Sequence, residues 1–242
     1  MVDWERFGKG VSALYKHLHL ASLPLSTEQR LLKIRDSFLS ILTFVVKKDR
    51  DELNAYRVKA APYRAELGKI QERVKREIKE MLQIEGISLR VYPASSYTAG
   101  TNLIEESDLD FNISINELNE DKLIRLSTAC GKYGYTFDGI KSEDNPGKHY
   151  VFQQETKGIH LVKTVEVEVK LRYGEFYEQV HKRMHDHLDG TALSQEQKAT
   201  ITWIKLNLKR LKNQSHYKEF KALYYEHALA QAGAYQMIYP LA

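Results

Sequence analysis

The chain has 242 residues, of which 43% are hydrophobic and 28% charged, and its formal net charge is +4. This balance is typical of a globular protein and excludes a disordered chain, and the apolar runs are shorter than the roughly 18–20 residues that cross a bilayer. The charged residues close to Met1 are not typical of a signal peptide. We therefore expect no membrane partner, whereas the mild positive charge permits a polyanionic one.

The single cysteine, Cys130, excludes an internal disulfide and favours a reducing intracellular compartment such as the cytoplasm. No obvious basic neighbour would stabilise its thiolate, so we expect Cys130 to be an inert packing residue. The sequence contains no internal repeat and no low-complexity tract.

The first predicted region, residues 1–85, is helical and is expected to pack on a sheet core. Ser26 is a helix start signal ahead of a run with apolar residues at helical spacing. A second segment has apolar positions three and four residues apart from Leu67 to Met81. Pro62 is expected to end or kink a helix, because proline lacks a backbone N–H and clashes with the preceding turn.

The second region, residues 86–173, is predicted to form the sheet. Gly86 ends the helical pattern, and apolar and polar residues alternate over 108–115 and over 164–170, the period of strands. The second of these patterns belongs to a strand predicted over 160–170. Further strands are predicted near 89–91, 135–137 and 149–153, with a helix over 117–130. This order predicts an α+β fold, a small mixed sheet flanked by N-terminal and C-terminal helices.

The third region, residues 174–242, is predicted to be helical again. Ser194 and Gln197 form a capping-box start for a helix to about residue 212, and a last helix over 217–232 is expected to end at Gly233. One face of the 195–212 helix is basic and is the best candidate surface for RNA. Its basic residues are Lys198, Lys205, Lys209, Arg210 and Lys212.

Two pairs of acidic residues carry the predicted chemistry. Asp108 and Asp110 stand two apart on a predicted strand, so both point to one face, where adjacent carboxylates repel unless a cation separates them. Hard cations such as Mg²⁺ take oxygen ligands, so the pair predicts a metal site. Glu166 and Glu168 share a face of a later strand. If one of them reaches the aspartates, three carboxylates can hold two ions about 3.5–4 Å apart for in-line attack on a phosphate.

A turn rich in small and hydroxyl residues, 95–101, precedes the aspartates. Its hydroxyls (Ser95, Ser96 and Thr101) and exposed backbone N–H groups suit a triphosphate, and Gly100 allows close approach. Lys148 lies in a predicted turn and is long enough to reach a phosphate as a point charge. We expect these residues to bind a nucleotide.

Together these segments resemble the DNA polymerase β-like nucleotidyltransferase superfamily over about residues 75–172. The matched positions are the turn residues Ser96, Tyr97, Gly100 and Thr101, the pair Asp108 and Asp110, and Glu168, or else Glu166, as the third acid. Ser95 replaces the usual motif glycine, and a glutamate stands where aspartate is commoner. The flanking helices look like the helical additions of poly(A) or poly(U) polymerases and of cyclic-oligonucleotide synthases.

The resemblance implies an enzyme that moves a nucleoside monophosphate from an NTP to a hydroxyl acceptor, first of all an RNA 3′ end, and releases pyrophosphate. Ser96 would hold the β- or γ-phosphate, Asp108 and Asp110 one Mg²⁺ or Mn²⁺ ion, and all three acids a second ion, with Glu168 as a candidate base. Two alternatives stay open. One is synthesis of a small messenger, either a cyclic oligonucleotide or an alarmone. The other is a degenerate nucleotidyltransferase fold acting as an RNA-binding module, which Ser95 keeps open.

Overall fold

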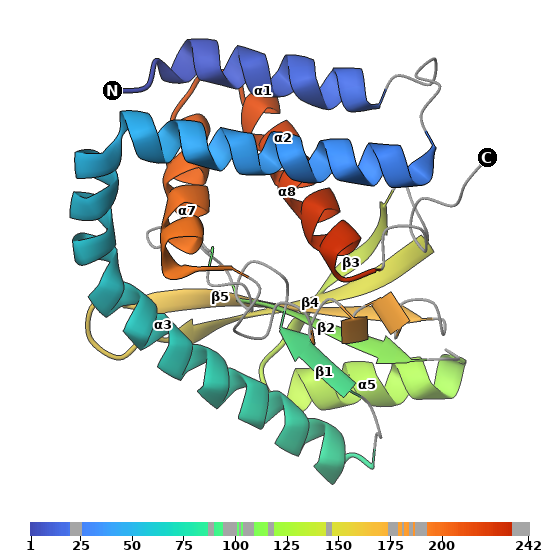
Figure 1. Ribbon diagram of the computed structural model, residues 1–242. Helices are drawn as coiled ribbons and strands as arrows, with labels where there is room; N and C mark the ends of the chain where they lie inside the picture. The colour runs from blue at the N-terminus through green and yellow to red at the C-terminus, as the bar shows by residue number, and fades with distance from the viewer. Residues whose placement is uncertain are drawn as a thin grey trace. The chain divides into compact units, whose positions relative to one another are not determined.

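The computed structural model describes residues 1–19, 26–86, 90–93, 101, 103, 109–115, 119–143, 147–173, 179–180, 182–183, 186 and 193–233. Over these ranges it has an α+β architecture with a five-stranded mixed sheet (Figure 1). The helices are α1 (Trp4–Leu18), α2 (Thr27–Lys48), α3 (Arg50–Ile84), α5 (Glu120–Lys132), α7 (Gln195–Lys209) and α8 (Ser215–Gln231). The strands are β1 (Arg90–Pro93), β2 (Leu109–Ile115), β3 (Thr136–Glu143), β4 (Gly147–Lys157) and β5 (Thr164–Tyr173).

Internal packing divides the chain into two units. A helical unit combines Met1–Lys59 with His187–Ala242, and a sheet unit comprises Ala60–Asp186. The boundary between them falls inside α3, whereas the sequence pattern placed its divisions at residues 85 and 173. Within the described ranges, no helix has both the length and the apolar character required to span a membrane.

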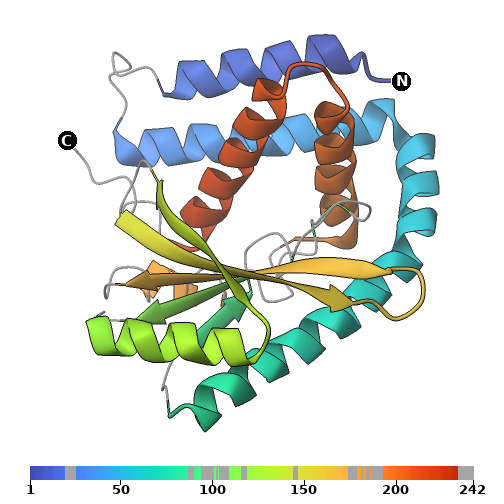
Figure 2. The same ribbon diagram turned by 180° about the vertical axis from the view of Figure 1, so that it is seen from behind.

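The sheet unit is built around strands in the order β1-β2-β5-β4-β3. β2 and β5 are parallel, and the other neighbours are antiparallel. One face carries the apolar side chains of the alternating pattern and is covered by α3 and α5 on the same side (Figure 2). The buried members of this core include Ile70, Val74 and Ile78 of α3, Leu126 and Cys130 of α5, and Phe111, Val167 and Val169 of the sheet.

The structure confirms the prediction that Cys130 is a packing residue. Its side chain is fully buried in this core, and burial raises the pKa of the thiol to about 12. The thiol is therefore protonated at neutral pH and is not available as a nucleophile.

The turn between β4 and β5 is tied to α3 by Glu66. Its carboxylate accepts hydrogen bonds from the backbone N–H groups of four consecutive residues, at 3.2, 2.7, 2.9 and 2.8 Å for residues 159, 160, 161 and 162. Gly158 makes the turn possible, because a Cβ there would overlap the carbonyl oxygen of Val162. Arg73, two turns further along α3, donates to the carbonyl of Lys157. The hairpin is thus fixed to the helix by backbone groups.

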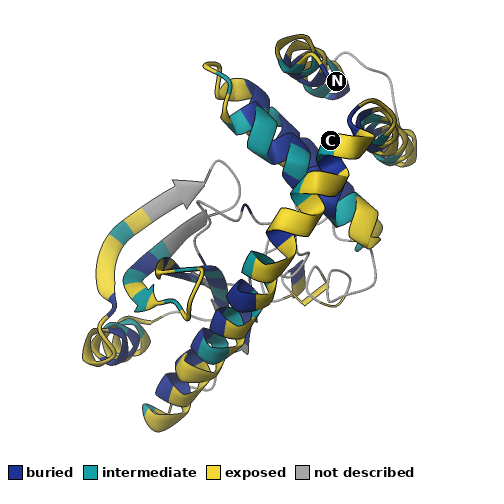
Figure 3. Cartoon of the chain, turned by 90° about the vertical axis from the view of Figure 1, so that its left-hand side faces the viewer, coloured by how far each residue is buried: buried dark blue, intermediate teal, exposed yellow. Residues whose placement is uncertain are grey.

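The helical unit packs α1 and α2 against α8 (Figure 1). Phe38 of α2 is fully buried, and its ring lies 6.0 Å from that of Phe220 and 4.6 Å from that of His227. Polar pairs join α1 to α8: Ser12 contacts His216 at 2.6 Å and His19 contacts Glu226 at 2.8 Å. Figure 3 colours one side of the helices mainly as buried and the opposite side as exposed.

Several predicted boundaries hold and others differ. Ser26 and Ser194 form the capping boxes of α2 and α7, and Gly86 and Gly233 have positive φ angles of 65° and 63° after α3 and α8. Pro62, however, lies inside a continuous α3 and does not end it. β3 and β4 are longer than predicted, because they pair with each other along polar residues whose alternation is weak.

Candidate functional site

The parallel pairing of β2 with β5 brings the predicted acids of two distant segments together. The register places Asp110 of β2 directly opposite Glu168 of β5. Both belong to the sheet face opposite the apolar core, because their neighbours Leu109, Phe111, Val167 and Val169 are buried in that core. The side chain of Asp110 is 22% exposed and that of Glu168 is 11% exposed. The acids therefore form a partly enclosed pair.

Lys170 lies between these two carboxylates. Its ammonium donates to Asp110 Oδ1 at 3.0 Å and lies 2.9 Å from Glu168 Oε2. Gln153 of β4, the antiparallel partner of Glu168, donates from Nε2 to Glu168 Oε1 at 2.7 Å. Both oxygens of Glu168 are thus engaged, one by a charge and one by a neutral amide.

The electrostatics of the pair follow from these contacts. Burial raises the pKa of Glu168, but the hydrogen bond and charge of Lys170, together with Gln153 and Asp110, lower it more strongly, to about 2. Burial lowers the pKa of Lys170, but the two carboxylates raise it above its ordinary value. Both net shifts favour the charged forms, so Glu168 is an ionised carboxylate throughout the neutral range.

The two candidate third acids differ in burial and in the residues opposite them. Glu166 is exposed and lies opposite Glu155 of β4, whereas Glu168 is buried and lies opposite Asp110. Of the two glutamates, Glu168 is therefore the one that lies opposite Asp110.

The remaining predicted site residues are less informative. Asp108, Ser95 and Ser96 lie outside the described residues. Thr101 is fully buried. Lys148 belongs to β4 and pairs with Ser142 of β3, and its side chain lies outside the described part of the structure.

Two observations bear on whether these residues suit a divalent cation. Asp110 and Glu168 offer the carboxylate oxygens that Mg²⁺ and Mn²⁺ prefer, and the Lys170 ammonium already occupies a position between them as a cation. Over the described ranges, no three acidic, histidine or cysteine side chains gather into a metal-binding group. Asp108, the third predicted ligand, is outside those ranges, so the two described acids supply part of a ligand set.

The predicted basic face of α7 is smaller than the sequence indicated. Lys205 is buried at 4% exposure, and Lys198 and Lys209 are partly buried. Only Arg210 and Lys212, just after the helix, are exposed. The lysine at position 205 therefore belongs to the interior, and the helix does not present a continuous basic surface.

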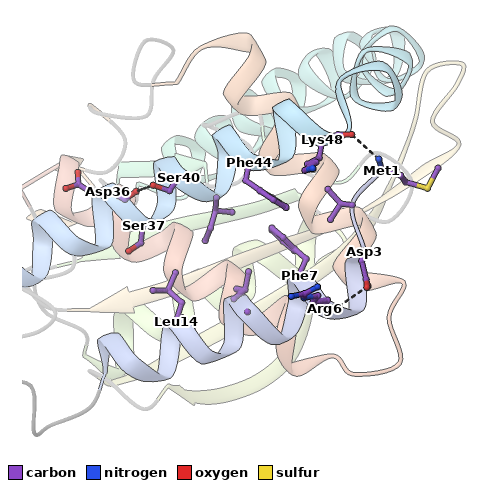
Figure 4. A pocket seen from close by; sticks show the side chains of 14 residues that line it. Met1, Asp3, Arg6, Phe7, Leu14, Asp36, Ser37, Ser40, Phe44 and Lys48 are labelled. Carbon is purple, nitrogen blue, oxygen red and sulfur yellow. Dashed lines mark hydrogen bonds between the residues drawn. The ribbon is translucent and has the colours of Figure 1, made fainter.

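A separate cavity of about 920 Å³ lies in the helical unit between α1 and α2 (Figure 4). Phe7 of α1 and Phe44 of α2 meet across it as stacked rings 6.2 Å apart. Arg6 and Lys48 line it as well. None of the residues predicted to act on a nucleotide lines this cavity.

Sequence reasoning missed Lys170 and Gln153 as members of the site. Lys170 carried a signal, because it follows Glu166 and Glu168 at the same two-residue spacing and so shares their face. Gln153 carried none, since its position depends on the register between β4 and β5.

No protein-family model matches this chain, and no curated protein sequence matches it significantly.

Proposed function

We propose that this protein is a metal-dependent nucleotidyltransferase of the DNA polymerase β-like type. It transfers a nucleoside monophosphate from an NTP to a hydroxyl acceptor and releases pyrophosphate. The acceptor that we propose first is an RNA 3′ end. The observation that carries the proposal is the register of β2 and β5, in which Asp110 lies opposite Glu168. The resemblance makes both residues metal ligands, although their motifs lie far apart in the chain. The parallel pairing of β2 with β5 makes the two residues neighbours.

In this proposal, Asp110 and Glu168, together with Asp108, hold the divalent cations. When bound, such cations activate the acceptor hydroxyl and neutralise charge on the phosphates. Glu168 acts as a ligand, because a carboxylate that is ionised at neutral pH offers its oxygens to a cation. Gln153 fixes the orientation of Glu168 through its 2.7 Å hydrogen bond.

The nucleotide would bind beside these acids through the hydroxyl-rich turn. Ser95 and Ser96 contribute hydroxyls and backbone N–H groups to the triphosphate, and Lys148 contributes a positive charge.

The test is incubation with each labelled NTP, Mg²⁺ or Mn²⁺ and a short RNA, with products separated by gel and by thin-layer chromatography. Extension of the RNA, lost in Asp110→Asn and retained in the exposed-acid control Glu155→Gln, would support the proposal. A new small nucleotide would assign the protein to messenger synthesis. No product in either format, with no metal-dependent NTP binding, would refute the proposal and favour an RNA-binding module.

A further inference from the structure

Lys170 occupies the place between Asp110 and Glu168 that a divalent cation needs. Its ammonium contacts one oxygen of each, at 3.0 and 2.9 Å. Both contacts are made to carboxylate oxygens that the proposed function uses as metal ligands. A cation that binds to both of these oxygens must therefore meet the ammonium at close range, where like charges repel strongly.

The charge balance explains why a lysine is found there. Asp110 and Glu168 are direct neighbours across the parallel pair, and two carboxylates that close destabilise each other when no cation is present. One ammonium leaves the three side chains with a formal charge of minus one. The acids are thus stabilised in the unliganded protein and still attract a more highly charged ion.

Lys170 is also suited to moving away. Its side chain is 22% exposed, so part of it reaches solvent. A lysine carries its charge on a flexible four-carbon stem, which lets the ammonium leave one pair of oxygens and reach another without movement of the strand. Gln153 differs, because its amide holds the second oxygen of Glu168 and does not compete for the same position.

We propose that Lys170 is an internal counter-ion that a divalent cation displaces from Asp110 and Glu168, an inference that rests on the proposed function. Lys170 stabilises the acidic pair before metal binding and lowers the affinity of the site for metal alone. Once displaced, its ammonium is available to the phosphate oxygens of the NTP. Metal and nucleotide then bind cooperatively, because the first frees the charge that the second uses.

The first experiment measures Mn²⁺ affinity by calorimetry or by electron paramagnetic resonance. Lys170→Met keeps the length of the stem and removes the charge, and we expect it to bind Mn²⁺ about tenfold more tightly than the wild type. Lys170→Arg keeps the charge and should remain close to the wild type. Lys163→Met, an exposed lysine in the β4–β5 connection, controls for the change in net charge. Asp110→Asn controls for the site.

The second experiment uses the wild-type protein alone and so does not depend on the folding of a variant. Reductive methylation followed by peptide mass spectrometry reports the reactivity of each lysine. We expect Mg²⁺ to increase methylation of Lys170 several-fold, because the amine loses its ion pairs, and to leave Lys163 unchanged.

The outcomes separate this inference from the function on which it rests. Equal or weaker Mn²⁺ binding in Lys170→Met, with binding lost in Asp110→Asn, overturns the counter-ion and leaves the metal site in place. Unchanged methylation of Lys170 in saturating Mg²⁺ also overturns the counter-ion and leaves the metal site in place. If neither the wild type nor Lys170→Met binds Mn²⁺, both the counter-ion and the proposed function are overturned.

Discussion

Two glutamates of the sheet unit, Glu66 and Glu168, have the same lowered pKa for different reasons. Burial raises the pKa of each, and in Glu66 four backbone hydrogen bonds lower it to about 2. In Glu168 the largest opposing effect is the hydrogen bond and charge of a lysine side chain, and the result is again about 2. Both residues are largely buried, since Glu66 is 8% exposed and Glu168 is 9% exposed.

The difference lies in whether the donors can move. The four N–H groups around Glu66 belong to the backbone of one tight turn, so removing them requires the turn to unfold. Lys170 can leave Glu168 by rotating its stem. Glu66 is therefore a structural anion held by backbone groups, whereas Glu168 is held by side chains, as the proposed counter-ion requires. Equal pKa shifts do not imply equal roles.

The largest expected effect separates the two glutamates by activity. On the proposed function, Glu168→Gln should lower nucleotidyl transfer by at least about 100-fold, because it removes a charge from the proposed metal ligands. Glu66→Gln should leave transfer close to the wild type. Single-turnover assays with labelled NTP measure both. Glu166→Gln, on the same face of the strand but exposed, is the matched control, and a loss there as large as in Glu168→Gln would contradict the assignment.

The next effect concerns the turn that surrounds Glu66. Gly158→Ala should destabilise the protein by about 2 kcal/mol, because the new Cβ overlaps the carbonyl oxygen of Val162. Gly68→Ala, in an open position of α3, should instead stabilise it by about 1 kcal/mol through helix propensity. Urea unfolding followed by circular dichroism measures both. Equal effects of the two substitutions would show that the turn is not tightly constrained.

A smaller effect tests the neutral partner of Glu168. Gln153→Leu removes the 2.7 Å hydrogen bond and should weaken Mn²⁺ binding about tenfold, since groups behind a metal ligand orient it. Gln154→Leu, the next residue on the opposite face of β4, is the control. Unchanged Mn²⁺ affinity in Gln153→Leu would mean that Lys170 alone positions Glu168.

The smallest effect is a change in the pH dependence of stability. The pKa of Glu66 falls from 4.5 to about 2 on folding. The contribution of Glu66 to the free energy of unfolding is therefore complete above pH 4.5 and is lost as the pH falls toward 2. Glu66→Gln should therefore flatten the stability profile in that window, and Glu168 should keep its own share of the slope. Thermal unfolding between pH 2 and 6 measures this, with the exposed Glu80→Gln as control. If stability depended on pH as steeply in Glu66→Gln as in the wild type, Glu66 would not contribute to this pH dependence.

The sequence predicted the α+β class and most elements because their signals are local. The capping boxes at Ser26 and Ser194, the alternation from Val165 to Val169 and the breaks at Gly86 and Gly233 depend on a few neighbouring residues. Pro62 was expected to end or kink a helix, and it does not end α3, since packing of the following turns on the sheet outweighs the loss of one backbone hydrogen bond.

By itself, the sequence determined which residues can share a face: Asp110 with Asp108, and Glu168 with Glu166 and Lys170. It did so because the two-residue period of a strand is a local property. Only the tertiary structure decided that Asp110 meets Glu168, that Lys170 lies between them and that Gln153 supports the pair. Strand order and register arise from contacts between distant segments, and no spacing within one segment specifies them.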